Sequence, residues 1–156
     1  MESLSPIRFS SVSMVTATLG SNDPMVGDRT ISGDEKYVFV YNTGNSQISP
    51  GYGTVLSAVT GYSVTVSSIT QVDMAAGFCK HATLTTATYG WLVTQGFCQV
   101  VMGANDSAAA GQLLALAVDG TVGLKSLSTG YMTPAIGKAM AGIGSGVSGT
   151  AYISLF

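Results

Sequence analysis

Apolar and polar residues alternate along much of this chain with a period of two, which is the spacing of a β-strand with one buried face. The segment KYVFVYNT at 36–43 is rich in β-branched and aromatic residues, and we assign it the same period. Within YSVTVSSITQV at 62–72, two valines alternate with Thr65 and Ser67. The last segment, TAYISLF at 150–156, alternates in the same way. These three segments predict strands.

Further strand-like runs follow one another from residue 34 onward, separated by turns rich in glycine. We expect strands at TVLSAV, FCKHATL, GWLVTQ, FCQVVM, LLALAV and TVGLKSL, that is at 54–59, 78–84, 90–95, 97–102, 113–118 and 121–127. The pair Asp119-Gly120 between the last two runs is a strong hairpin signal. Two segments, 106–111 and 133–143, are candidates for helix, but one is very short and the other contains internal glycines. Eight to ten short strands predict an all-β fold, a small sandwich or barrel.

The first 30 residues differ in composition from the rest of the chain. They contain two prolines, the turn-like SNDP at 21–24 and one alternating segment at 12–19. We therefore expect an extended N-terminal arm over residues 1–30, with a first strand inside it, followed by a single β domain over 31–156. The sequence shows no internal repeat and no linker to a second domain.

The stretch YGWLVTQGFCQVVM at 89–102 holds the chain's one tryptophan. On an extended strand, Trp91 and Val93 share one face and Leu92 takes the other, so both faces are apolar. We expect one face to meet the core and the other a second sheet or subunit. Gly90 allows the bulky Trp91 ring to pack close to the backbone, and Gly96 favours a bend into the next strand. Tyr89, Gly90, Trp91 and Gly96 are thus predicted to form a structural anchor.

Charge changes this picture little, because the chain carries so few charged residues. They make up 9% of the sequence, against about 25% in typical globular domains. The net charge is -2, and the six basic residues are scattered rather than clustered. Direct binding of nucleic acid, which needs a basic patch, is not expected. No apolar run is long enough to span a membrane, so no membrane partner is expected. Such an apolar, weakly charged surface favours association with other chains.

Candidate chemistry is sparse. Cys79 and Cys98 each follow Gly-Phe, and with His81 they are too few for a zinc site of about four ligands. We interpret them as reduced thiols, with a cross-strand disulfide as the alternative. GSGVSG at 144–149 has the spacing of a dinucleotide-binding loop but precedes a strand, not a helix. The acidic residues lie mostly in turns, and no nucleophile motif is present. We expect no enzyme activity, cofactor or metal.

Three pieces of the sequence resemble, in order, the head decoration or cement proteins of tailed bacteriophages. The resemblance covers about residues 75–156. The residues that carry it are Tyr89, Gly90, Trp91, Val93 and Gly96, then Gly111, Leu113, Asp119 and Gly120, then Gly137, Ala139, Gly149, Ile153 and Leu155. Gln95 and Cys98 depart from the pattern without breaking it.

The resemblance implies a structural virion protein that binds the outer surface of an assembled capsid and stabilises it. Its partner would be the major capsid protein, and it would be a homo-trimer, with a dimer as the alternative. It would sit on the capsid exterior after assembly in the host bacterial cytoplasm. We expect the arm to contact the capsid, including Arg8, Phe9 and Arg29.

Other functions stay open. A phage fibre or receptor-binding module would bind carbohydrate through exposed tyrosines, for which Tyr52, Tyr62 and Tyr131 are candidates. A minor capsid or tail component would polymerise. A small hydrolase would need an acid beside His81 in space.

Overall fold

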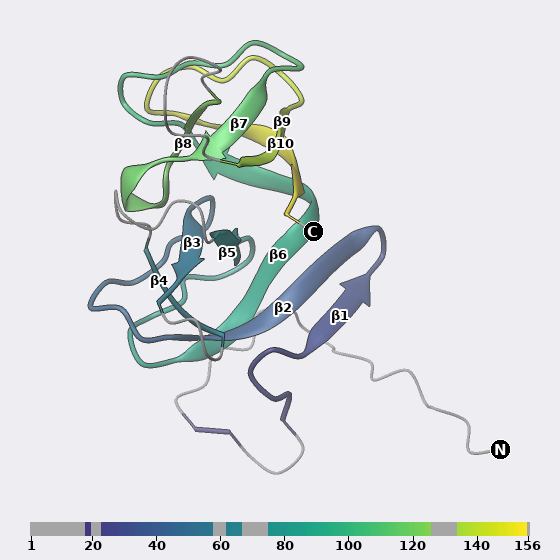
Figure 1. Ribbon diagram of the computed structural model, residues 1–156, viewed down its shortest axis with the longest axis vertical. Helices are drawn as coiled ribbons and strands as arrows, with labels where there is room; N and C mark the ends of the chain where they lie inside the picture. Colours follow the sequence, from purple (N-terminus) through teal and green to yellow (C-terminus); the bar gives the residue numbers. More distant parts are fainter. Residues whose placement is uncertain (1–17, 20–22, 58–61, 67–74, 126–133, 156) are drawn as a thin grey trace, which may run out of the picture.

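The computed structural model describes residues 18–19, 23–57, 62–66, 75–125 and 134–155, and these residues form an all-β fold, as the sequence predicts (Figure 1). One 3-10 turn, η2, interrupts the strands at Val118–Gly120. The strands within these ranges are β1 (Arg29–Ser32), β2 (Glu35–Asn42), β3 (Gly53–Leu56), β4 (Ser63–Val66), β5 (Ala75–Phe78), β6 (Tyr89–Val101), β7 (Leu113–Leu116), β8 (Val122–Leu124), β9 (Ala135–Ala139) and β10 (Ser148–Ser154). None of these elements is a helix long and apolar enough to cross a membrane.

The first half of the chain closes into a five-stranded barrel, here called barrel 1. Its strands follow the order β2-β4-β3-β5-β6, and β6 pairs back onto β2. The pair β2–β4 is parallel and the others are antiparallel. Because every strand then has two neighbours, the barrel leaves few backbone groups unpaired. Strand β1 adds to β2 outside the barrel as an antiparallel hairpin.

The second half repeats this arrangement and is here called barrel 2. The C-terminal part of β6 pairs with β10, and the order continues β10-β9-β7-β8. A parallel bridge between Met102 and Val122 joins the end of β6 to β8. This bridge corresponds to the parallel pair β2–β4 of barrel 1. Figure 1 shows barrel 1 below and barrel 2 above, with β6 running from one to the other.

The expectation of no internal repeat is therefore wrong. The pairing β3–β5 has a register shift between Thr54 and Val55, and β7–β9 has one between Leu114 and Ala115, 60 positions further on. The backbone bonds agree as well. The amide of Gly51 donates to the carbonyl of Cys79, and that of Gly111 donates to that of Ala139, again 60 positions later. The isolated bridge Ile48–Leu84 recurs as Ala108–Ile143.

Strand β6 belongs to both barrels. The sequence predicts two strands hinged at Gly96, whereas the structure has one continuous strand, because ladder bonds persist on both sides of the bend. Gly96 has φ +125, a conformation that favours glycine. A Cβ atom added there would lie 2.7 Å from Cγ of Glu35. Glycine at this position therefore allows both the bend and the close approach of β2.

Two hydrophobic clusters fill the molecule. The inner core lies inside barrel 1 and consists of Val38, Val40, Ile48, Val64, Ala76, Cys79, Leu84 and Leu92. The shared core combines the interior of barrel 2 with side chains from the outer face of barrel 1. Trp91 and Val93 belong to the shared core and Leu92 to the inner core, as the alternation predicts. Trp91 is 6% exposed and packs on Phe39, with ring centroids 5.0 Å apart.

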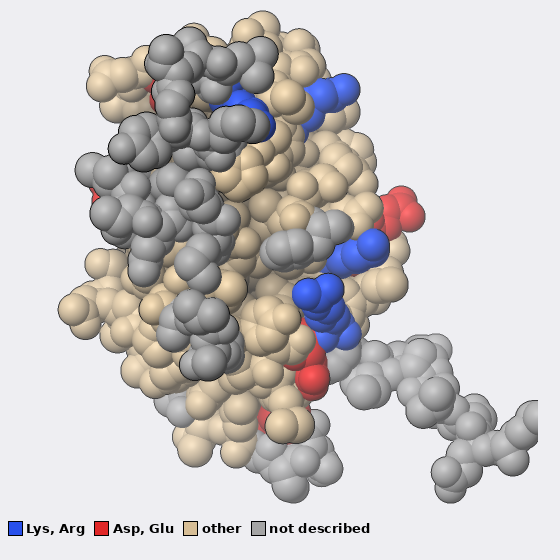
Figure 2. Space-filling model, in the orientation of Figure 1, with Lys and Arg blue, Asp and Glu red and all other residues tan. Residues whose placement is uncertain are grey.

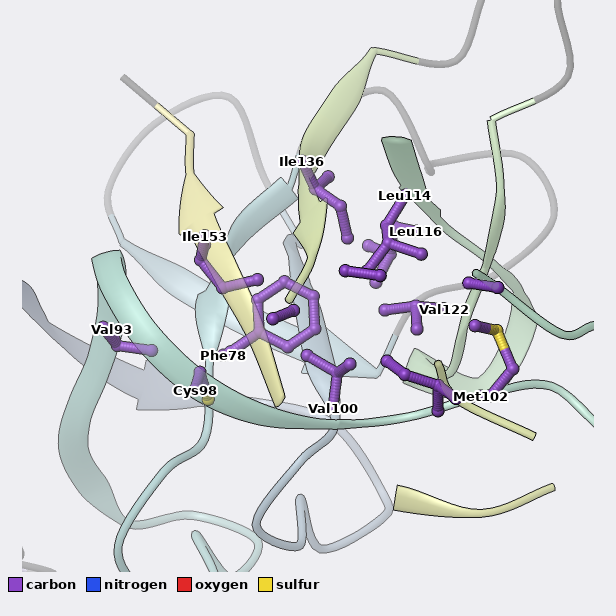
Figure 3. Packing of buried hydrophobic residues seen from close by; sticks show 14 of the residues in the cluster. Phe78, Val93, Cys98, Val100, Met102, Leu114, Leu116, Val122, Ile136 and Ile153 are labelled. Carbon is purple, nitrogen blue, oxygen red and sulfur yellow. The ribbon is translucent and has the colours of Figure 1, made fainter. Parts of the chain in front are cut away.

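Phe78 joins the two barrels. It lies on β5 of barrel 1, is fully buried, and belongs to the shared core. Figure 3 shows its ring among side chains of barrel 2, including Val100, Leu116 and Ile153. A Cβ atom added at Gly53, the register partner of Phe78, would collide with both Leu116 and the Phe78 ring. The Phe78 ring therefore fills space inside barrel 2 that the strands of barrel 2 leave open.

Other sequence expectations have mixed outcomes. The hairpin at Asp119-Gly120 is confirmed: β7 and β8 pair antiparallel, and both turn residues have positive φ. Neither helix candidate is helical, and 133–143 contains β9. The strand expected at 78–84 lies earlier, at Ala75–Phe78, because the following residues make only the isolated bridge at Leu84. The first-strand segment at 12–19 falls mostly outside the described residues.

The insertion of Phe78 gives a paired prediction. Phe78→Ala should lower the free energy of unfolding by about 3–5 kcal/mol, because it empties a buried aromatic site. The matched control is Lys138→Ala at the corresponding position of barrel 2, where the exposed side chain should change stability by no more than about 0.5 kcal/mol. Urea denaturation followed by circular dichroism measures both. If both substitutions changed the free energy of unfolding by the same small amount, the Phe78 contact would not hold the barrels together.

Candidate attachment surfaces

The sequence places candidate contact residues in the N-terminal arm, and the structure describes part of it. Arg8 and Phe9 lie outside the described residues. The segment just before β1 is bonded to barrel 1: the amide of Gly27 donates to the carbonyl of Phe39 at 2.8 Å, and the amide of Phe39 donates to the carbonyl of Asp28 at 2.8 Å. Arg29 itself is the first residue of β1. This part of the predicted arm is thus attached to the barrel.

Strand β1 exposes an apolar residue between two cations. Ile31 is 69% exposed and pairs directly with Lys36 on β2, so both side chains project from the same face. Arg29 lies two residues before Ile31 and shares that face. Figure 2 shows Lys and Arg side chains together with Asp and Glu side chains along one side of the molecule, with uncharged tan surface around them. The hairpin β1–β2 therefore offers an exposed apolar side chain flanked by two cations, next to the predicted arm.

A hydrogen-bonded network lies behind this hairpin, at the bend of β6. Glu35 is paired with Lys80 and accepts a hydrogen bond from the Tyr37 hydroxyl. The same hydroxyl lies 3.1 Å from Nε2 of His81. Since Tyr37 donates to Glu35, its oxygen can accept from His81, which requires the tautomer with hydrogen on Nε2. The network ties β2 to the segment after β5.

The pKa values in this network follow from burial and from its bonds. Burial alone would raise the pKa of Glu35, but the bonds from Lys80 and Tyr37 outweigh it and the pKa is lowered. Burial, together with the charge of Lys80, lowers the pKa of His81. Burial and the bond to Glu35 raise the pKa of Tyr37. Tyr37 is 1% exposed and keeps its proton, so it is a poor nucleophile.

The hydrolase alternative required an acid near His81, and Glu35 is linked to it through Tyr37. The arrangement nevertheless buries the hydroxyl between them instead of presenting it to a substrate. The two cysteines are unpaired and buried, and burial raises the pKa of Cys79 to about 11 and that of Cys98 to about 12. Among the described residues, no group of three or more His, Cys, Asp or Glu side chains could hold a metal ion.

The predicted anchor residues lie on the barrel-1 part of β6. The Tyr89 ring stacks on Phe39 with ring centroids 6.0 Å apart, and it meets the Tyr41 ring at a tilt with centroids 4.6 Å apart. Gly90 is buried and pairs with Val40 on β2, while Gly96 marks the bend. These positions give the aromatic rings a rigid support on the outer face of barrel 1.

The tyrosines named for carbohydrate binding do not gather at one site in the described residues. The ring of Tyr62 packs close to Gly27, where an added Cβ atom would lie 2.6 Å from it. Tyr52 lines an open cavity of about 330 Å³ with Asp119 of η2 and residues 46–49 and 66. Tyr131 lies outside the described residues. One half-buried tyrosine in a shallow cavity gives little surface on which a sugar ring could stack.

Sequence reasoning missed the surface on β1 and the network around Glu35. The surface on β1 could have been found from the dipeptide Ile31-Ser32, because its apolar residue lies in a short segment between charged residues on both sides. The second joins residues far apart in the chain, so no local pattern indicates it.

Comparison with known proteins supports the fold. No family model matches the chain, and neither does any curated protein. Among solved structures, the fold is similar to that of the head fiber gp8.5 N base in bacteriophage phi29, with a TM-score of 0.50 and 17% sequence identity. The similarity covers 76% of this chain and 95% of the phage chain. The chain therefore shares its fold with a base that belongs to a phage head fibre.

The network around Glu35 predicts that acid weakens the fold. The pKa of Glu35 is lowered on folding, so its contribution is present above its ordinary pKa of 4.5 and is lost as the pH falls through the lower folded value. The pKa of His81 is also lowered, so protonation of the unfolded chain below 6.5 disfavours the fold. The melting temperature should fall as the pH is lowered from about 7 to well below 4.5, first through the contribution of His81 and then through that of Glu35. The melting temperature of the double variant Glu35→Gln, His81→Gln should fall less over this pH range. The control Asp34→Asn, in the nearby turn, should show the same fall as wild type. Parallel curves for wild type and the double variant would contradict this assignment.

Proposed function

We propose that this chain is a structural protein of a bacteriophage virion that attaches to the outside of the head, in the manner of a head-fibre base. The observation that carries the proposal is the shared fold over 95% of the phage fibre base. The sequence resemblance to head decoration proteins points to the same location on the virion. The buried, protonated Tyr37 hydroxyl and the buried thiols are consistent with a role that needs no catalysis.

The fibre alternative is better supported than a cement protein. A cement protein reinforces the joints between capsid subunits, whereas a fibre base has to hold an outward projection at a fixed point. The shared core, which couples the two barrels through Phe78, suits the second task, since a rigid base transmits load without bending. Capsid stabilisation is therefore a separate outcome of the binding experiment.

The proposed partner is the major capsid protein, bound through residues 1–30 and the exposed face of β1. Arg8, Phe9 and Arg29 are the proposed contacts within this segment, and Ile31 and Lys36 extend the surface on the hairpin. We propose a homo-oligomer, a trimer or alternatively a dimer, on the exterior of the head. Several weak contacts to one capsid site then bind with an effective affinity well above that of a single chain.

Binding to purified heads tests the proposal. The full chain should co-sediment with heads of the virus that encodes it, and a chain lacking residues 1–17 should lose most of this binding while its circular dichroism and melting temperature stay unchanged. The cut leaves Leu19, which packs against the shared core, in place. The substitution Arg29→Glu, Lys36→Glu in the full chain should weaken binding by about tenfold or more.

The outcomes separate the parts of the proposal. No binding of the full chain to heads would overturn head attachment. Undiminished binding of the truncated chain would remove the arm as the contact but leave attachment in place. A higher temperature of head disruption in the presence of the chain would restore the cement interpretation, because a ligand that binds only the assembled head stabilises it.

A further inference from the structure

Barrel 2 exposes a row of four side chains across neighbouring strands, here called the outer row. Phe97 on β6 pairs with Tyr152 on β10, Tyr152 pairs with Lys138 on β9, and Lys138 pairs with Leu113 on β7. Directly paired residues project from the same face of a sheet. Phe97 and Leu113 are each 49% exposed, and the Phe97 ring meets Tyr152 edge to face at 5.3 Å. The outer row is therefore an apolar strip with one cation in it.

Barrel 1 has the corresponding row, and there it is buried. Tyr37 on β2 pairs with Val93 on β6, Val93 pairs with Phe78 on β5, and Phe78 pairs with Gly53 on β3. These four positions are the topological equivalents of the outer row, since each occupies the same strand and register in its barrel. Tyr37, Val93 and Phe78 are at most 1% exposed and belong to the shared core. In barrel 1 this row is the contact with the next barrel.

We propose that the outer row of barrel 2 docks against a barrel of a second copy of this chain. The argument is the equivalence of the two rows: the same face that carries the contact between barrels inside one chain is exposed on barrel 2. Half-exposed phenylalanine and leucine on the outer face of a sheet are typical of a surface that another protein covers. The inference rests on the self-association included in the proposed function and names its surface.

The contact between copies should run head to tail. Lys138 stands where barrel 1 has Phe78, so two outer rows placed face to face would bring two like charges together. The contact between the two barrels within the chain also joins two different surfaces, because the row of barrel 1 meets the interior of barrel 2. A heterologous contact of this kind closes into a ring when the rotation allows it. The strip is small, so closure of a ring would add the affinity that one contact lacks.

Sedimentation velocity of the isolated full chain, without heads, tests the inference. Wild type should sediment as a multiple of 15.9 kDa. Phe97→Glu and Leu113→Glu should each weaken association by about tenfold or more and shift the chain toward the monomer. The matched control is Val147→Glu, because Val147 is 51% exposed on barrel 2 but lies outside the row. It should leave the oligomer intact, and all three variants should keep the melting temperature of the monomer fold.

A monomeric wild type would overturn the inference, and so would an oligomer that survives both substitutions in the row. Loss of the oligomer in Val147→Glu to the same degree would also overturn it, since the effect would then not be specific to the row. None of these results bears on head attachment, which is measured separately with purified heads. Failure of head binding with an intact oligomer would affect only the proposed function.

Discussion

The insertion of Phe78 into the interior of barrel 2 is the contact on which the rest of the structure depends. A five-stranded barrel has a small core, and the inner core of barrel 1 consists of three valines, two leucines, an isoleucine, an alanine and a cysteine, with no aromatic ring. Barrel 2 fills its interior only with the help of the outer face of barrel 1. Barrel 2 is therefore not a complete hydrophobic unit by itself, and it shares one core with the outer face of barrel 1 through β6, which bends at Gly96.

This sharing fits the attachment role proposed for this weakly charged chain. The aromatic ladder of Phe39, Tyr89 and Trp91 supports the β1–β2 hairpin from behind, and the bonds of Glu35 fix that hairpin beside the bend. The exposed apolar side chains are thus carried on rigid strands, where they lose little conformational freedom on binding. One such surface lies on barrel 1 and the other on barrel 2. A head-attached protein that also assembles with its own copies needs two separate surfaces of this kind.

Much of the local structure was predictable from the sequence, but the long-range structure was not. KYVFVYNT is rich in β-branched and aromatic residues, and its strand was placed within a residue at each end. The opposite faces of Trp91 and Leu92 follow from the period of two of an extended strand. The repeat was missed because the equivalent residues differ in kind: Phe78 corresponds to Lys138. Apart from glycines such as Gly51 and Gly111, mainly spacing and register link the two barrels, and register is not visible before the strands are paired. The strand at Ala75–Phe78 was misplaced because its alanines and glycine give a weak strand pattern, and the more apolar residues after it make only an isolated bridge.

The cooperativity of unfolding tests the shared core most directly. Differential scanning calorimetry of the full chain, at a concentration where it does not associate, compares the calorimetric enthalpy with the van't Hoff enthalpy. If the two barrels depend on one core, a single transition with a ratio near one is expected. Two resolved transitions, or a ratio near two, would show that each barrel folds by itself, and this would contradict the dependence of both barrels on the Phe78 contact.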